Sequence, residues 1–450
     1  MNGLGGRALG RRLCGSVALA ASALALSAGS AGAVPAFAAQ TGQACNACHI
    51  GGFGPELTPF GRNFKAGGYT LRVTKWNVPL SAMAVASYVH TQKDQAGGAA
   101  PGYSANDNVT LDQASVFVAG NIGSHFGAFI QTTYDGVAKA FHWDNTDIRA
   151  VTTTSVKGNS VILGASLNNA PAVEDPFNTL VAWGFPYTSS SLAPGAPAAP
   201  IIGAYAQEAI GLTGYAWINS SIYLEAGGYQ SPGINFLRRG GVDPFSPGDI
   251  SGTAPYARIA FQKVMGDKNF EVGAFGFWAD LYPGRDRSAG ATDHYADTGV
   301  DASFQYFLAD HDVITVNGRW VHEDETFNAS FPLGLSTNRN DSMDELRGQV
   351  SYYWRDKIGL TVAPFYITGS ADSLLYGSRT GKPDTTGVFL QLDGTPWGAS
   401  NSPLGRRFNL RLGLQYVIYN RFAGSSHNYD GAGANASDNN TLRAFAWVAF

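Results

Sequence analysis

The chain has 450 residues and a formal net charge of −4, which is too slight to indicate nucleic acid or another charged partner. Charged residues make up 14% of it, against about 25% in ordinary soluble domains, while glycine (56 residues) and aromatic residues (12%) are abundant. These figures argue against the two or three soluble domains that the length alone would suggest.

The first 33 residues have the pattern of a secretory signal peptide. Three arginines precede the apolar stretch "GSVALAASALALSAGS", and small residues offer cleavage after Ala33 or Ala38. The stretch is too short for a membrane-spanning helix, and no later apolar run reaches the 18 or so residues that such a helix needs. Cys14 precedes the apolar stretch and would be removed with it. We therefore predict an exported chain that keeps only Cys45 and Cys48.

Residues 45–49 read "CNACH", the C-x-x-C-H pattern to which c-type haem is attached. In this pattern Cys45 and Cys48 form thioethers with the haem vinyl groups, and His49 binds the iron on one face. A zinc site would need two further suitable ligands, and a thioredoxin-like dithiol would need a surrounding βαβ pattern. The sequence provides neither, so it predicts one covalently bound haem c.

Residues 34–78 are predicted to form a short monohaem cytochrome segment. So short a segment buries too little apolar surface to be stable alone, whereas a barrel of about sixteen strands has a lumen wide enough for a small plug. We expect the segment to fold around the haem inside the barrel or against its periplasmic mouth. Lumen-facing arginines such as Arg319, Arg347, Arg407 and Arg411 are candidates to pair with haem propionates or with plug carboxylates. The alternative, expected for most of them, is that they join the salt-bridge network of the lumen itself.

Met83 is the candidate for the second axial ligand of the haem iron. It is the methionine closest in sequence to the motif, ahead of Met265 and Met343, and it lies where the first strand should leave the periplasm. His90 lies further along the same strand. Methionine ligation would raise the reduction potential of the iron. The alternative is a methionine that simply packs on a strand.

Residues 79–450 alternate between apolar and polar side chains with a period of two. In "RFNLRLGLQYVIY", Leu410, Leu412 and Leu414 fall on one face, while Arg411 and Gln415 fall on the other. "DELRGQVSYYW" and "DVITVNGRWVHE" repeat the pattern. A strand between lipid and a wet lumen has this period, with apolar side chains outward. A soluble sandwich also alternates, but its solvent-facing side is rarely so rich in Arg, Gln and Tyr.

The alternation predicts an all-β fold, an antiparallel outer-membrane β-barrel of about sixteen strands. The strands begin near residues 80, 111, 125, 144, 158, 206, 221, 254, 268, 295, 312, 343, 358, 385, 405 and 440. Short connections alternate with long ones, which include 168–205, 230–253, 280–294 and 325–342. Bacterial barrels have short periplasmic turns and long external loops. The terminal "NTLRAFAWVAF" ends its apolar face on Phe450, as barrel assembly signals do.

Two stretches resemble the fused monohaem cytochrome c–porins of iron-oxidising bacteria. One is "AFAAQTGQACNACHIGGFGPELTPFGRNFKAGGYTL" with "PLSAMAVASYVHT", and the other is the ending "YNRFAGSSHNYDGAGANASDNNTLRAFAWVAF". The similarity is closest over 36–92 and 415–450 and is architectural elsewhere. It implies an outer-membrane Fe(II) oxidase whose single haem is bound by Cys45 and Cys48 and ligated by His49. It also implies extracellular Fe(II) as the donor and a periplasmic c-type cytochrome or other soluble carrier as the acceptor.

An acidic stretch near the outer rim is a candidate for Fe(II) docking, because carboxylate and imidazole ligands suit Fe(II). It comprises His322, Glu323, Asp324 and Glu325, with Asp341, Asp344, Glu345, Asp293 and His294 on neighbouring strands. The alternative is a solvated acidic rim. Two other functions stay open, a haem conduit for another donor or acceptor and a diffusion porin with a structural haem plug. No nucleophilic triad, phosphate-binding loop or pair of catalytic carboxylates is evident in the sequence.

Overall fold

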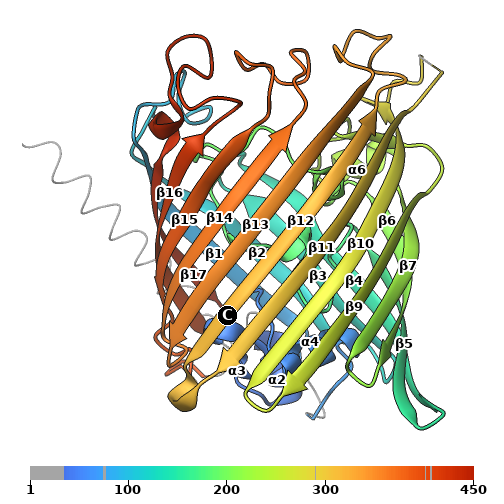
Figure 1. The fold of residues 1–450 in the computed structure, drawn as a ribbon. Helices are drawn as coiled ribbons and strands as arrows, with labels where there is room; N and C mark the ends of the chain where they lie inside the picture. Colours follow the sequence, from blue (N-terminus) through green and yellow to red (C-terminus); the bar gives the residue numbers. More distant parts are fainter. Residues whose placement is uncertain (1–34, 74–77, 289, 401, 406–407) are drawn as a thin grey trace, which may run out of the picture.

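The computed structural model describes residues 35–73, 78–288, 290–400, 402–405 and 408–450. The predicted signal peptide and Arg407 lie outside the described residues. Sixteen long antiparallel strands and one short strand form a single sheet (Figure 1), and the sheet closes because the first strand pairs with both the second and the last. Closure leaves no unpaired edge, which is what a sheet surrounded by lipid requires.

The strands follow one another around the barrel in chain order. Their bounds are β1 (Leu80–Thr91), β2 (Asn108–Asn121), β3 (Phe126–Asp135), β4 (Ala140–Val156), β5 (Asn159–Asn168), β6 (Ile210–Ile218), β7 (Ile222–Gln230), β8 (Gly248–Ile250), β9 (Ala254–Met265), β10 (Lys268–Pro283), β11 (Asp293–Phe307), β12 (Val313–Thr326), β13 (Asn340–Trp354), β14 (Ile358–Gly369), β15 (Thr385–Gly394), β16 (Asn409–Arg421) and β17 (Thr441–Ala449). The short β8 pairs with the upper end of β10. Each long strand begins within four residues of its predicted start, which confirms the sixteen-strand prediction.

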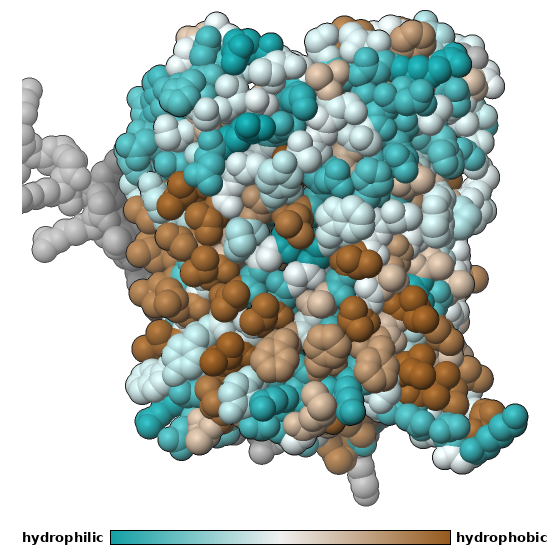
Figure 2. Space-filling view, viewed as in Figure 1, coloured by the Kyte–Doolittle hydropathy of each residue, from teal (hydrophilic) through white to brown (hydrophobic). Residues whose placement is uncertain are grey.

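Apolar and polar side chains alternate along the strands in the predicted orientation, with the polar ones facing the lumen. On β16, Arg411 is 1% exposed and Gln415 3%, whereas Leu412 and Leu414 are 49% and 48% exposed. Figure 2 shows apolar side chains gathered over the lower and middle parts of the visible wall, with polar ones above. A closed barrel with an apolar outer surface is the architecture of outer-membrane proteins. The chain is therefore an outer-membrane β-barrel.

The N-terminal segment lies inside the barrel at the end where the C-terminus also lies (Figure 1). It contains α2 (Pro35–Thr41), α3 (Cys45–Cys48), η1 (Ile50–Gly52) and α4 (Pro59–Ala66). Arg62 donates to Gln262 Oε1 (3.0 Å) and to Ser303 Oγ (2.9 Å), both on lumen-facing positions, and Tyr69 donates to Asp147 Oδ2 (2.6 Å). Among the described residues, no helix is long and apolar enough to cross a membrane.

The sequence predicts that residues 168–205 form a long external loop. The structure differs, because the connection after β5 folds into the lumen of the barrel. It includes η2 (Val181–Trp183) and α5 (Ile201–Ala204). Its Phe177 is buried against Tyr215, Trp217 and Tyr223, which are inward-facing aromatic residues of β6 and β7. An open channel would have polar side chains facing water at these positions. Because the positions are aromatic here, the loop can bury its apolar side chains against the barrel wall, which is more favourable than exposing them to solvent.

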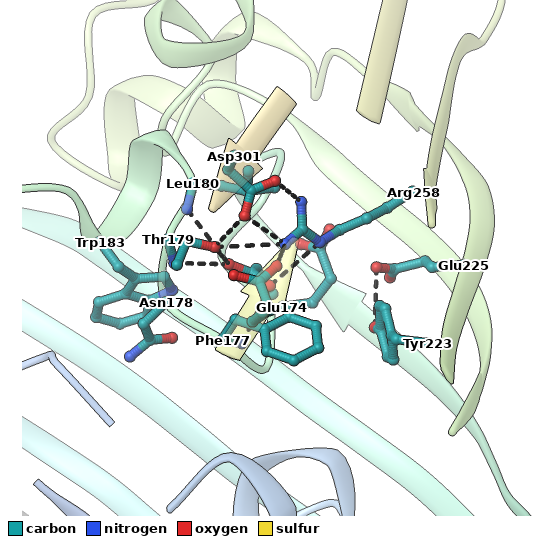
Figure 3. A network of polar contacts seen from close by, with 12 residues as sticks. Glu174, Phe177, Asn178, Thr179, Leu180, Trp183, Tyr223, Glu225, Arg258 and Asp301 are labelled. Carbon is teal, nitrogen blue, oxygen red and sulfur yellow. Dashed lines mark hydrogen bonds and ion pairs between the residues drawn. The ribbon is translucent and has the colours of Figure 1, made fainter. Parts of the chain in front are cut away.

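Charge pairing also fixes this loop to the barrel wall (Figure 3). Arg258 on β9 lies 3.3 Å from Asp175 of the loop and 2.8 Å from Asp301 on β11, and all three side chains are fully buried. The N-terminal segment and residues 169–209 thus both occupy the lumen. We refer to residues 169–209 as the inward loop.

Candidate haem-binding site

The C-x-x-C-H motif forms one short helical turn followed by a tight reversal. Cys45 and Cys48 are three residues apart in α3 and therefore lie on the same side of it, and the His49 amide donates to the Cys45 carbonyl (2.9 Å). The chain then turns back through Gly51 and Gly52, which have φ values of 66° and 73°. Glycine adopts this left-handed conformation without steric cost, so the reversal directly follows the histidine.

Helix α4 packs closely on the motif. The Thr58 side chain caps its first turn by accepting from the Gly61 amide (3.2 Å), and the Thr58 amide donates to the Cys48 carbonyl (3.0 Å). A Cβ at Gly61 would lie only 2.3 Å from the Cys48 carbonyl oxygen. Gly61 is therefore the position that lets the helix approach the second cysteine.

A cavity of about 330 Å³ lies beside the motif, and its lining is what a c-type haem requires. Both cysteines, His49 and Met83 line it together. The rest of the lining comes from the segment, the inward loop and the strands. It combines aromatic side chains, among them Phe53, Phe64, Phe117, Phe129, Trp183, Tyr187 and Trp447, with polar ones that include Gln113, Gln131, Asp144 and Asn409. A mostly apolar cavity with a few convergent polar groups is typical of a cofactor site.

The imidazole of His49 is available for a metal. Its Nδ1 is buried without a hydrogen-bond partner, and burial lowers the pKa of His49 to about 4. The ring is therefore neutral at physiological pH, which is the form that ligates metal ions.

Burial keeps the two cysteines in the neutral thiol form. It raises the pKa of Cys45, and it raises the pKa of Cys48 to about 12 with a further contribution from Cys45. Both thiols are free. Because the thiolate is the nucleophile in disulfide exchange, these values count against an exchanging dithiol at this motif.

Met83 is the fourth residue of β1 and therefore lies near the start of the first strand, as the sequence predicted. Its sulfur accepts hydrogen bonds from Trp447 Nε1 (3.3 Å) and, over a longer distance, from Gln113 Nε2 (3.9 Å). To ligate a metal, the sulfur would exchange the longer of these two contacts for the metal bond. His90 lies at the opposite end of the strand, where it is paired with Asp107 (2.8 Å). Met265 and Met343 do not line the cavity.

The arginines predicted as propionate partners bind other groups. Arg319 and Arg347 both pair with Glu345, at 2.6 Å and 2.7 Å. Arg411 lies 3.4 Å from Asp393 and donates to the Gly51 carbonyl (3.2 Å). Within the described part of the chain no arginine lines the cavity, and the one lysine that does is Lys65. The sequence analysis missed Lys65.

The four residues predicted to dock Fe(II) do not form one site. Glu323 and Glu325 face the lumen and are buried, whereas His322 and Asp324 face outward. His322 lies 3.0 Å from Asp344 and 3.4 Å from Asp324 on that outer face. Successive side chains of a strand point to opposite faces, which is why neighbours in sequence diverge here. Across the described residues, no group of three or more His, Cys, Asp or Glu side chains is arranged to hold a metal ion.

No protein-family model matches the chain, and no curated protein does. Solved outer-membrane proteins are similar to it at low sequence identity. In-vitro folded OmpT of Vibrio cholerae is 12% identical over 85% of this chain and 99% of OmpT (TM-score 0.43). OmpF of Salmonella typhi in complex with daunomycin is 12% identical over 83% and 98% (TM-score 0.47), and an anion-selective porin from Comamonas acidovorans is 11% identical over 82% and 98% (TM-score 0.45).

The chain's own barrel defines its class. It is a closed antiparallel barrel of sixteen long strands, polar inside and apolar outside. The chain is therefore an outer-membrane protein of the β-barrel class.

Proposed function

We propose that the protein is an outer-membrane cytochrome–porin that carries electrons from extracellular Fe(II) to a soluble periplasmic carrier through one haem c. The observation that supports this proposal most directly is the cavity beside the motif. Two free thiols, a neutral imidazole whose Nδ1 has no hydrogen-bond partner and a thioether sulfur line it together. When bound, a haem supplies reversible one-electron chemistry at its iron.

The lining residues have distinct roles in this proposal. Cys45 and Cys48 would hold the macrocycle through two thioethers, and His49 and Met83 would be the residues that ligate its iron. Trp447 would orient the Met83 sulfur through the 3.3 Å hydrogen bond. Methionine ligation raises the reduction potential, which favours accepting an electron from a weak donor. The aromatic lining keeps water from the group.

Fe(II) as the donor rests on the resemblance to iron-oxidising cytochrome–porins and on simple chemistry. Ferric iron precipitates near neutral pH, so oxidation outside the cell avoids deposits within it. One Fe(II) gives one electron, which matches a single haem.

Reduction of the purified protein by Fe(II) tests the proposal. We expect the chain from native outer membranes to keep its haem on a denaturing gel, because the attachment is covalent. We also expect its ferric spectrum to change to the ferrous one when Fe(II) is added without oxygen. A haem-bearing protein that is inert to Fe(II) but reduced by another donor would support a conduit of different specificity. A protein without haem would refute the proposal.

Conductance separates the proposal from a diffusion porin. The N-terminal segment and the inward loop both fill the lumen, and their contacts with the wall are buried. We therefore expect the intact protein to conduct ions poorly in planar bilayers. A stable open-pore conductance would favour a diffusion porin in which the haem is structural.

A further inference from the structure

One buried cation lines the same cavity as the two cysteines. Lys65 belongs to α4, where Gly61, Phe64 and Lys65 lie at positions i, i+3 and i+4 and therefore share the helix face that lines the cavity. Gly61 is the residue that approaches the Cys48 carbonyl. Lys65 is four residues after Gly61, so it lies about 6 Å further along the helix axis than the contact between Gly61 and Cys48.

The Lys65 ammonium has donors to spare. Its Nζ donates to the Val173 carbonyl and to Asn178 Oδ1, each at 2.7 Å, and lies 4.6 Å from the centre of the Trp183 ring. An ammonium has three N–H donors, so one is left after these two bonds. The residue is 5% exposed, and within the described residues no carboxylate lies at ion-pair distance from it.

The charges around Lys65 favour an anion at this point of the cavity. The pKa of Lys65 is lowered to about 7, mainly by burial and also by the positive charge of Arg149, against the opposing effect of Asp147, Asp175 and Glu174. Asp147 is already paired with Arg149 at 2.8 Å, and Asp175 with Arg258. A buried ammonium without its own counter-ion is unfavourable, and a carboxylate arriving in the cavity would remove that cost.

We propose that Lys65 binds the carboxylate of a haem propionate, and this inference rests on the haem proposal above. The propionates are the anionic groups of a haem, and Lys65 is the one lysine or arginine on the cavity lining among the described residues. A positive charge beside a propionate favours the reduced iron, whose charge is lower. Lys65 is therefore a positioning residue that also raises the reduction potential of the haem.

Spectroelectrochemical titration of full-length variants tests this assignment. Lys65→Met removes the charge but keeps the length of the side chain, and we expect a more negative haem potential than in the unchanged protein. Lys65→Arg keeps the charge and should restore the potential. Lys157→Met, in the exposed turn between β4 and β5, is the matched control and should leave the potential unchanged. An unchanged potential in Lys65→Met, or an equal shift in Lys157→Met, would overturn the assignment.

A folding defect is separable from the proposed role. If Lys65→Met loses its haem, Lys65→Gln provides a second test, because its amide can still donate to Val173. Loss of haem in Met and Gln variants with retention in Lys65→Arg supports a charge requirement, and loss in all three refutes it. If the unchanged protein itself lacks haem, the haem proposal fails. If the unchanged protein binds haem but the haem potential is the same in the Lys65 variants, only this inference fails.

Discussion

Single glycines determine how closely the motif can be packed. A Cβ at Gly61 would meet the Cys48 carbonyl oxygen at 2.3 Å, so one of the two backbone segments would have to shift. We expect Gly61→Ala to destabilise residues 35–73 by about 1–3 kcal/mol, the usual cost of overpacking. The measurement is the temperature at which proteinase K begins to cleave this segment in the folded barrel. Gly195→Ala, where a Cβ meets nothing within 4 Å, is the control. Identical cleavage of the two variants would contradict the close approach.

The role of Met83 can be tested by one substitution. Met83→Leu removes the sulfur and keeps the apolar volume, so we expect haem attachment at the cysteines to persist while the haem potential falls. Met343→Leu changes a buried methionine on β13 that does not line the cavity, and it should have no such effect. If the potential of Met83→Leu equals that of Met343→Leu, Met83 is only a packing residue.

Residues of the site differ in how far the sequence reveals them. Both cysteines and His49 are visible because their spacing is a motif, and Met83 is visible because the strand period fixes where β1 begins. Lys65 has no such signal, since a buried lysine looks like a surface lysine in sequence. Trp447 could have been noticed, because it is a large aromatic residue on the face of the last strand where other strands carry polar side chains.

Among the elements, the inward loop is held mainly by a buried charge network. Arg258 lies at ion-pair distance from Asp175, Asp301 and Glu271, at 3.3, 2.8 and 3.4 Å (Figure 3). Arg258→Met would remove the ion-pair partner of three buried acidic groups. We therefore expect the loop to be destabilised by about 3–5 kcal/mol. Faster cleavage by chymotrypsin within residues 169–209 would show this change. Arg238→Met on the exposed helix α6 (Ile234–Arg239) is the control, and equal cleavage in both variants would exclude the network as the anchor.

The strands and the inward loop differ in predictability for a physical reason. A strand between lipid and lumen imposes a period of two on its own residues, so β12, β13 and β16 can be read locally. The burial of Phe177 instead depends on Tyr215, Trp217 and Tyr223, about forty residues later, and on charges still further along the chain. Proline- and alanine-rich stretches such as "LAPGAPAAP" therefore look like an external loop.

At the scale of the whole molecule, the wall of the barrel closes independently of its contents. β1 pairs with β2 and β17 through its own backbone, so the ring of strands does not need the N-terminal segment. The two lumen fillers reach different depths. The segment surrounds the motif near the periplasmic turns, while the inward loop extends upward until the Ile201 amide donates to Glu323 Oε2 (2.6 Å) near the outer end of β12.

Two fillers at different depths predict how conductance responds to deletion. Removing residues 35–73 leaves the inward loop across the lumen, and shortening the loop leaves the segment, so each single deletion should raise bilayer conductance only slightly. Removing both should give the steady conductance of an open sixteen-strand pore, because such a barrel has an aqueous lumen once nothing fills it. Heat-dependent migration on a gel would confirm that each variant still forms a barrel. Full conductance after removal of the segment alone would mean that the inward loop leaves a path for ions, and that the N-terminal segment is the sole barrier.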